Sequence, residues 1–345
     1  MQSSLRKNLT FLIIAFFAFS YQFANPVTTS NYKTVEAAAD STVILGGQSI
    51  GVNINIDGIL ILGLSDFYGD DGKKHCPAKE AGLREGDIIV SVNNKTVTSA
   101  TEFSNIVDQS NDLNIYVEYR RGEQKLSTTI IPVKSAEDSK YRLGLWARDG
   151  TTGIGTLTFI EPSTNNFAAL GHGVADADTG ELIIGNGNIY FSSINNVQKA
   201  SGTRPGELQG YFISSEIGDI VTNSDYGIFG KCYNANFSGQ QISVASRQEI
   251  STGEATIYCC IDGEKVEDFS INIEKININS KDNKSMVIRI TDEKLLDRTG
   301  GIVQGMSGSP VVQNGKLIGA VTHVFVNNPE KGYCIFAELM LDRCQ

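Results

Sequence analysis

The sequence has few of the residues that would build a metal site, a disulfide-bonded scaffold or a membrane bundle. Its 345 residues include six cysteines, three histidines and one tryptophan. Six cysteines without C-x-x-C spacing suit neither a small disulfide scaffold nor a structural zinc site, so we expect no metal and no other cofactor. Beyond the N-terminus, no apolar run approaches the roughly 20 residues of a membrane-spanning helix, which excludes a multi-span membrane protein.

The charge balance argues against a nucleic-acid partner. The chain carries 29 basic and 39 acidic residues, for a net charge of −10, and has no long basic block. Its 35 glycines follow no collagen-like period and often stand beside valine, isoleucine and threonine. This composition predicts a mainly β protein of many short strands and tight turns, long enough for two domains.

The first residues look like an export signal. Arg6 and Lys7 precede an apolar stretch over residues 9–23, and no convincing cleavage site follows. We therefore predict a signal or anchor segment over residues 1–24 and a polar tether over 25–42. Positive charge before the apolar stretch places the remainder of the chain across the membrane.

Residues 43–133 are predicted to form a small α+β domain. Alternating residues from Val52 onward and an apolar run over 59–64 indicate strands. Pro77 can begin a short helix, a second helix is expected over 99–109, and a hairpin turns at Arg121-Gly122.

This region resembles a PDZ domain. The resemblance rests on the motifs Pro77-Ala78, Ala81-Gly82-Leu83, Gly86-Asp87-Ile88-Ile89 and Val92-Asn93. PDZ domains bind an extended peptide along a sheet edge beside a helix. The resemblance implies that the loop and strand that hold the peptide carboxylate are Gly47, Gln48, Ser49, Ile50, Gly51 and Val52.

After a charged linker, residues 142–345 are dense in short predicted strands and contain the strongest chemical motif. Gly305-Met306-Ser307-Gly308-Ser309-Pro310 is a turn that opens into a strand and an Asn-Gly hairpin. This arrangement is typical of the nucleophile in chymotrypsin-fold serine peptidases, which implies a double β-barrel. Ser307 would be the nucleophile, and the backbone N–H groups of Gly305 and Ser307 would form the oxyanion hole.

A serine nucleophile requires a base, and the chain offers three histidines. His75 lies in the PDZ-like region, and His323 lies in the strand after the nucleophile, where its ring would line the cleft or pack. His172 stands at an apolar strand end with a glycine on either side. Those glycines would let its imidazole reach another strand, so we predict His172 as the base.

A carboxylate should orient the base, and spacing alone does not select it. Four residues are candidates: Asp176, Asp178, Asp292 and Asp297. Asp292 ends an apolar strand, which suits an oriented group, whereas Asp176 and Asp178 follow His172 closely and fit a loop.

Almost the whole chain is similar to the stage IV sporulation protein B family of signalling serine peptidases. The similarity is carried by the segments 46–52, 143–146, 155–159, 169–173, 178–182, 205–208, 226–230 and 299–310. It implies a catalytic triad of His172, Asp292 and Ser307. It also implies a location at the forespore inner membrane facing the intermembrane space, self-cleavage, and cleavage of a regulator of an intramembrane metalloprotease that leads to sigma-factor activation.

Two other functions remain open on the sequence alone. The PDZ-like region would also suit a peptide-binding adaptor with an inactive barrel, although the serine, histidine and an aspartate are all retained. A general quality-control protease is the other alternative, but no trimerisation segment or second PDZ domain supports it.

Overall fold

The computed structural model describes residues 41–344 except 177–179, 181, 184, 202–203 and 234–238. The predicted signal or anchor segment and nearly all of the polar tether lie outside the described residues. Within the described part, no helix is both long and apolar enough to cross a bilayer. The six cysteines are buried thiols.

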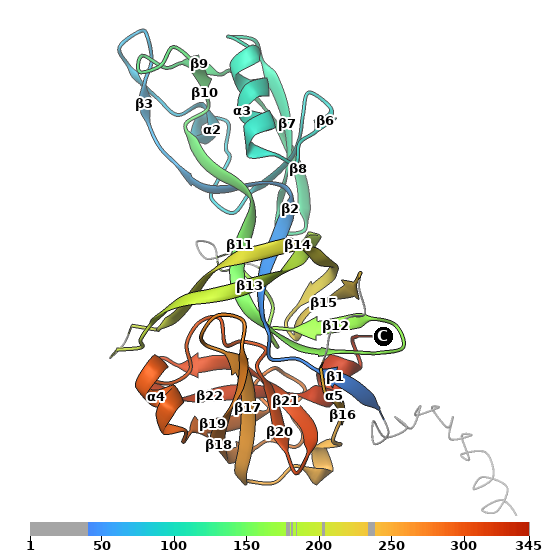
Figure 1. Ribbon diagram of the computed structural model, residues 1–345. Helices are drawn as coiled ribbons and strands as arrows, with labels where there is room; N and C mark the ends of the chain where they lie inside the picture. Colours follow the sequence, from blue (N-terminus) through green and yellow to red (C-terminus); the bar gives the residue numbers. More distant parts are fainter. Residues whose placement is uncertain are drawn as a thin grey trace, which may run out of the picture. The chain divides into compact units, whose positions relative to one another are not determined.

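Six antiparallel strands close the first of two rings (Figure 1). Neighbours pair in the order β2–β11–β12–β15–β14–β13 and back to β2. The strands are β2 (Ser49–Leu64), β11 (Leu145–Ile160), β12 (Asn166–Ala169), β13 (Gly187–Gln198), β14 (Glu207–Ser224) and β15 (Gly227–Cys232). Two short strands, β1 (Thr42–Leu45) and β16 (Gln241–Ser243), extend this sheet beyond β11.

Alternating apolar residues fill this ring because successive side chains of a strand point to opposite faces. On β2, Ile50, Val52 and Ile54 are buried while Asn53 and Asn55 are more exposed. The three buried residues pack in one cluster with apolar residues of the other strands: Leu157, Phe167, Ile189, Ile220 and Ile228.

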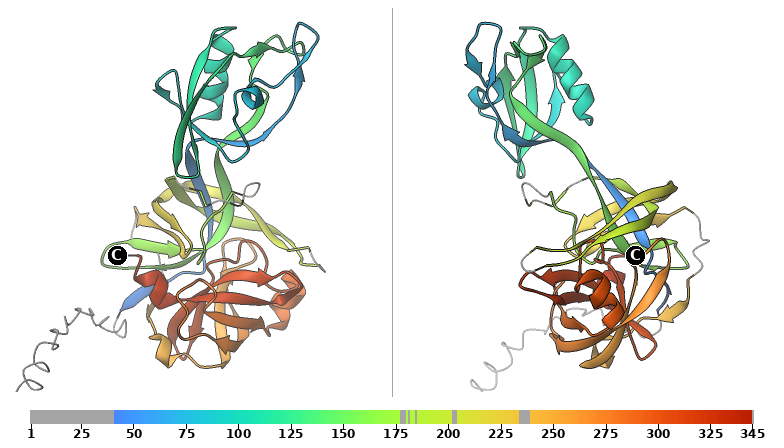
Figure 2. Two further views of the ribbon diagram at one scale, coloured as in Figure 1. Left: turned by 180° about the vertical axis from the view of Figure 1, so that it is seen from behind. Right: turned by 60° about the vertical axis from the view of Figure 1, so that its left-hand side comes forward.

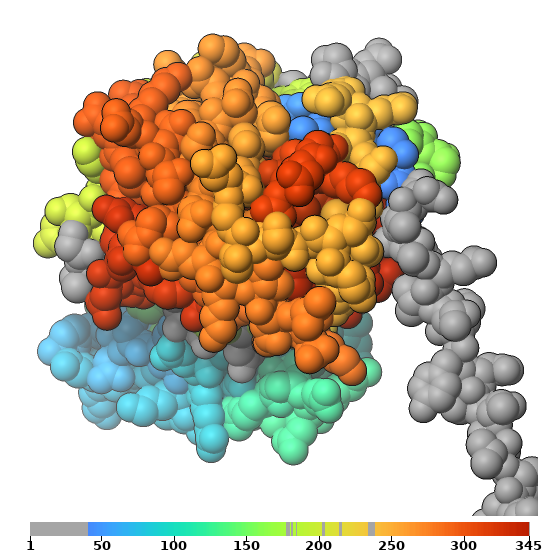
Figure 3. Space-filling view, turned by 90° about the horizontal axis from the view of Figure 1, so that it is seen from below, coloured from blue at the N-terminus to red at the C-terminus, as the bar shows by residue number. Residues whose placement is uncertain are grey.

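The second ring is a closed barrel with the strand order β17-β18-β19-β22-β21-β20. Its strands are β17 (Gly253–Cys260), β18 (Val266–Ile276), β19 (Met286–Ile290), β20 (Pro310–Gln313), β21 (Lys316–Phe325) and β22 (Asn328–Phe336). The short helices η2 (Arg247–Glu249), α4 (Glu293–Thr299) and α5 (Ala337–Leu341) flank it. Figure 3 views the molecule from the side where this barrel, orange to red, forms a continuous surface. Together the rings confirm the predicted double β-barrel.

The PDZ-like domain is inserted between two strands of the first ring. β2 leaves the ring and pairs with β5 at Ile59 and Leu60, and the chain returns through β11. Between them lie β3 (Phe67–Tyr68), β4 (Lys74–His75), α2 (Pro77–Glu80), β5 (Ile88–Val92), β6 (Lys95–Thr96), α3 (Ala100–Gln109), β7 (Ile115–Arg121), β8 (Gln124–Ile130), β9 (Val133–Lys134) and β10 (Tyr141–Arg142). Figure 2 shows α3 lying along one side of this group of elements.

This insertion corrects the predicted boundary at residue 43. β1 pairs with β11 and β16, and the first half of β2 pairs with β13 and β11, so residues 42–55 belong to the peptidase rings. The sequence did not reveal this because β2 is one uninterrupted strand that serves both domains. The PDZ core begins with Ile59 and Ile61, which pack against Leu83, Phe103 and Ile115.

Candidate active site

The turn that carries Ser307 joins the second ring to the first. The Ser307 carbonyl accepts a hydrogen bond from Thr156 N at 2.9 Å. Thr156 Oγ1 donates to the Gly305 carbonyl, and Thr158 Oγ1 donates to the Gly308 carbonyl, each at 2.8 Å. Strand β11 therefore fixes the nucleophile turn through three hydrogen bonds.

Gly308 is required at this junction for two reasons. Its φ of +95° lies in a region that favours glycine. A Cβ there would stand 2.1 Å from the Thr156 carbonyl oxygen and 2.5 Å from Leu170 N. A side chain would therefore separate the turn from the first ring.

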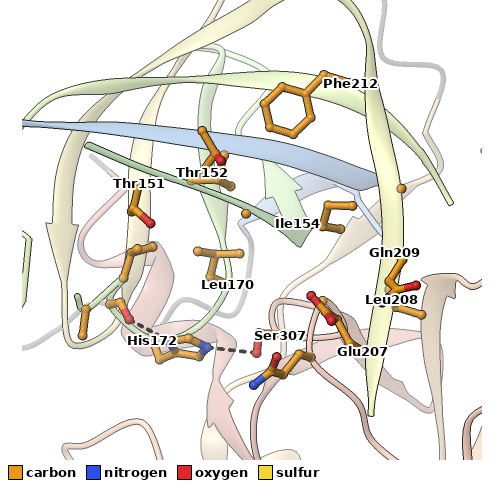
Figure 4. Close-up of a pocket in the computed structure, with 18 residues that line it drawn as sticks. Thr151, Thr152, Ile154, Leu170, His172, Glu207, Leu208, Gln209, Phe212 and Ser307 are labelled. Atoms are coloured by element: carbon orange, nitrogen blue, oxygen red, sulfur yellow. Dashed lines mark hydrogen bonds between the residues drawn. The ribbon is translucent and has the colours of Figure 1, made fainter. Parts of the chain in front are cut away.

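His172 reaches Ser307 from the first ring. The histidine follows β12, and its Nε2 lies 2.9 Å from Ser307 Oγ (Figure 4). Leu170 and Gly171, the two residues before it, both have positive φ, which ends the strand and turns the chain toward the other ring. The structure thus brings together the two side chains that the sequence predicted as base and nucleophile.

The other ring nitrogen of His172 has a backbone partner. Nδ1 lies 2.8 Å from the Gly173 carbonyl oxygen, which fixes Nδ1 as the protonated nitrogen when the ring is neutral. Nε2 is then free to accept the Ser307 proton. Ser307 Oγ also lies 3.0 Å from the Thr322 carbonyl, a second acceptor for the same hydroxyl.

Among the described contacts, the ring of His172 bonds Gly173 and Ser307 and makes no hydrogen bond with Asp292, whose triad role stays a prediction. Asp292 is the N-cap of α4: its Oδ1 accepts from Leu295 N at 3.0 Å, and its Oδ2 accepts from Ser270 N at 3.4 Å. The carboxylate thus accepts hydrogen bonds from two backbone N–H groups of its own barrel.

The other candidate carboxylates have different places. Asp176 is almost fully buried and forms an ion pair with Arg148. Asp297 lies within α4, and Asp178 lies outside the described residues.

The two predicted oxyanion donors line the cleft beside the catalytic pair. The Gln304 carbonyl accepts from Leu208 N, and the Met306 carbonyl accepts from Ser309 N and Ser309 Oγ. Each of these carbonyls shares a peptide bond with the N–H group of the next residue, and the two groups of a trans peptide point in opposite directions. The N–H groups of Gly305 and Ser307 therefore point away from those contacts. Neither N–H donates to any described residue.

Burial affects both histidines of the site. Desolvation lowers the pKa of His172, opposed by its hydrogen bond to the Gly173 carbonyl. His323 on β21 lies with its ring centroid 4.9 Å from that of His172. Desolvation, with smaller contributions from His172 and Lys284, lowers the pKa of His323 to about 4. Both rings are therefore held in their neutral form, which is the form a general base requires.

The cleft in front of Ser307 has a volume of about 620 Å³. Figure 4 shows Leu170 and Ile154 between the catalytic pair and Phe212, with Glu207 near Ser307. This space can hold several residues of an extended polypeptide.

The predicted carboxylate-binding loop is not in the PDZ domain. Ile50, Gly51 and Val52 are paired with β13, Gly47 N and Leu157 N make hydrogen bonds that join this segment to β11, and Ser49 Oγ is bonded to Ser192 Oγ. Gln48 lies between these contacts in the same segment. Residues 47–52 are therefore interior parts of the first ring and are not available to a peptide.

A second cleft of about 400 Å³ lies between α3 and residues 141–147. The carbonyls of Leu143 and Gly144 accept from Ala78 N and Ser65 N, whereas their own N–H groups donate to no described residue. The first part of β11 pairs with β2, and this cleft lies along it. The sequence signal that could have identified this cleft is Leu143-Gly144-Leu145, in which a glycine stands between apolar residues at the start of a strand.

These features define a serine peptidase with an inserted PDZ domain. The chain belongs to the SpoIVB peptidase S55 family, whose model matches residues 139–341, and a PDZ domain family matches residues 70–121.

Other relatives match a smaller part. Serine protease HTRA1 of Xenopus laevis is 43% identical over 56 residues, and HTRA1A of Danio rerio is 38% identical over 58. These matches span 16% and 17% of this chain but only 12% of either relative. Among solved structures, the Rv3671c protease of M. tuberculosis covers 55% of this chain and 81% of its own at 15% identity and a TM-score of 0.33. The PDZ domain of an SdrC-like protein of Listeria monocytogenes covers 26% and 87% at 17% identity and a TM-score of 0.22.

Proposed function

We propose that this peptidase is exported across the cytoplasmic membrane and acts in sporulation signalling. In this proposal it cleaves itself and then a membrane-associated regulator of an intramembrane metalloprotease, which leads to sigma-factor activation. The support is membership of the SpoIVB family and the basic and apolar N-terminal sequence.

The proposed chemistry is acyl transfer, and the contact of 2.9 Å between His172 Nε2 and Ser307 Oγ carries it. Ser307 Oγ attacks the scissile carbonyl while His172 takes its proton. The N–H groups of Gly305 and Ser307 bind the oxyanion. His172 then returns the proton to the leaving amine, and water repeats the sequence to release the acyl group.

A fluorophosphonate probe tests the assignment of the nucleophile. We expect the wild-type protein to be labelled on Ser307 and the Ser307→Ala variant to remain unlabelled and uncleaved. Ser65→Ala, at a serine far from His172 in sequence and in the second cleft, is the control. An unlabelled wild type that still binds peptides would favour the inactive adaptor.

The signalling role needs a cellular test. The gene is expressed in an endospore-forming host that lacks its own S55 peptidase, and sporulation and self-cleavage fragments are followed. Wild type should restore spores and Ser307→Ala should not. Broad degradation of denatured proteins without restored sporulation would favour the quality-control alternative.

We further propose that the second cleft holds the C-terminus of a peptide, with the N–H groups of Leu143 and Gly144 as carboxylate donors. Trp146 lines this cleft and is the single tryptophan, so its fluorescence reports binding. Peptides with a free C-terminus should bind and their amidated forms should not. Gly144→Ala should weaken binding because φ is +74° and a Cβ would lie 2.7 Å from the Ser65 carbonyl. Equal binding of free and amidated peptides would reject this site.

A further inference from the structure

The orientation of His172 depends on the loop that follows it. Gly173 supplies the acceptor for Nδ1, so a movement of the Gly173 carbonyl would release the imidazole. In proteases with a carboxylate at this place, the acceptor is a charged side chain. Here the acceptor is part of the main chain, and the groups that hold the loop of residues 173–176 determine its position.

One group that holds this loop is Asn223 on β14. Its Oδ1 accepts from Val174 N at 2.8 Å, and its Nδ2 donates to the Val174 carbonyl at 2.8 Å and to the Ile183 carbonyl at 3.0 Å. This amide fixes the middle of the loop against the first ring.

A second side chain that holds this loop is Arg148, at its far end. Arg148 Nη2 is paired with Asp176 Oδ2, and the side chain of Asp176 is 2% exposed while that of Arg148 is 27% exposed. Without Arg148 this ion pair is lost, and the end of the loop loses a contact that joins it to β11. The loop would then be held less firmly in the position that orients His172.

Arg148 is fixed on the strand that also holds the nucleophile. β11 carries Arg148 and, further along, Thr156 and Thr158, whose hydroxyl groups bond the turn around Ser307. Between them, residues 151–154 line the catalytic cleft. One strand thus sets the position of the nucleophile directly and the position of the base through Arg148.

We infer that Arg148 is a positioning residue for catalysis: its ion pair with Asp176 holds the loop after His172 so that the Gly173 carbonyl orients the imidazole toward Ser307. Arg148 itself touches neither reacting group. This inference rests on the proposed roles of His172 and Ser307.

The test measures how fast a fluorophosphonate labels Ser307, separated into the maximum rate and the half-saturating concentration. Because a small displacement of a catalytic group can cost up to about 100-fold, we expect Arg148→Met to lower the maximum rate about tenfold. The half-saturating concentration should change less than about twofold, since residues 151–154 and 207–210 still line the cleft that binds the probe.

Two further variants separate positioning from general stability. Arg148→Lys keeps the charge and should recover most of the rate. The double variant Arg148→Met/Asp176→Asn should be no slower than Arg148→Met, because both variants lack the same ion pair.

A matched control lies in the PDZ domain. Arg121 pairs with Asp87 at exposures of 30% and 1%, nearly the same as the Arg148 pair, but far from His172 in sequence and outside its loop. Arg121→Met should destabilise the fold without changing the labelling rate. An unchanged rate in Arg148→Met, or an equal loss in Arg121→Met, would overturn the inference. Labelling that persists in Ser307→Ala would overturn the proposed function instead.

Discussion

The two rings of the peptidase supply its two reacting side chains and are built in different ways. In the ring that carries Ser307, most of the paired strands are close in sequence, and Ser307 precedes a tight hairpin. In the ring that carries His172, β2 and β11 are separated by an entire PDZ domain and still pair. The nucleophile turn is thus a local motif that β11 anchors, whereas the ring that carries the base closes through strands that are distant in sequence. Variants that affect one ring at a time can test this contrast.

The largest expected effect is at the base. His172→Gln should lower kcat on the order of 10⁶-fold, because a missing base costs about as much as a missing nucleophile. The folded state should persist, as shown by circular dichroism. His75→Gln, at a half-buried histidine of the PDZ domain, is the control and should leave kcat unchanged. Substantial activity in His172→Gln would mean that another group accepts the proton.

The next effect is at the junction of the rings. Gly308→Ala should lower kcat by roughly 100-fold, because the new methyl group would displace the nucleophile turn from β11. It should also destabilise the fold by about 1–3 kcal/mol through overpacking. Gly315→Ala is the matched control: its φ is +74°, but a Cβ there meets no atom within 4 Å. Equal losses in both variants, by activity and urea unfolding, would show that backbone strain alone is responsible.

The pH dependence of activity should reflect the burial of the base. His172 accepts a proton only when neutral, so activity rises with pH through its pKa, and burial lowers that pKa. We expect the acid limb of the labelling rate to lie below pH 6.5, the ordinary histidine value. A midpoint above pH 6.5 would contradict the burial that the structure shows.

Stability should have a pH dependence of its own. The pKa of His323 is about 4 in the folded protein and about 6.5 in the unfolded chain, so the unfolded chain binds more protons between these values. The free energy of unfolding should therefore fall as the pH drops from about 6.5 to about 4. His323→Phe should flatten this dependence in urea titrations, and an unchanged dependence would contradict the burial of this ring.

The smallest effect concerns Asp292. Because Asp292 caps α4, Asp292→Ala should cost about 1 kcal/mol of stability and Asp292→Asn much less, since asparagine also caps helices. From the observed contacts we expect Asp292→Asn to keep kcat within about tenfold of wild type. A loss of about 10⁴-fold, the cost of removing a triad aspartate, would show that Asp292 reaches His172 during catalysis.

The parts of the fold set by local sequence could be predicted. The second helix, which begins at Ala100 rather than 99, matched closely because apolar spacing and a capping serine define it. The nucleophile turn and the glycine-flanked histidine could also be identified, because each is a short motif whose residues are consecutive in the sequence. The distance between His172 and Ser307 could not be predicted from the sequence. It depends on β11, which pairs with β2 on either side of the PDZ insertion and also bonds the nucleophile turn.

The errors arose where one segment serves two parts of the fold. Residues 47–52 have the glycine and apolar pattern of a peptide-binding loop, yet that pattern here fills the first ring. Asp292 follows an apolar strand as a buried triad member would, but it also stands just before the helix at residue 293. The sequence contains both signals; the structure shows the helix cap, and the triad role stays a prediction that Asp292→Asn tests.

The position of the PDZ insertion has a consequence for engineering. Ala147 on β11 faces Ile61 on β2, so the chain leaves and re-enters the β2–β11 ladder at adjacent points, and a bridge there keeps Arg148. A two-residue Asn-Gly turn could bridge those points and yield a shortened enzyme with its double barrel complete. Conversely, an unrelated ligand-binding domain whose N- and C-termini lie close together could replace the PDZ domain at this ladder. The activity of such a fusion protein would then report the binding of that ligand.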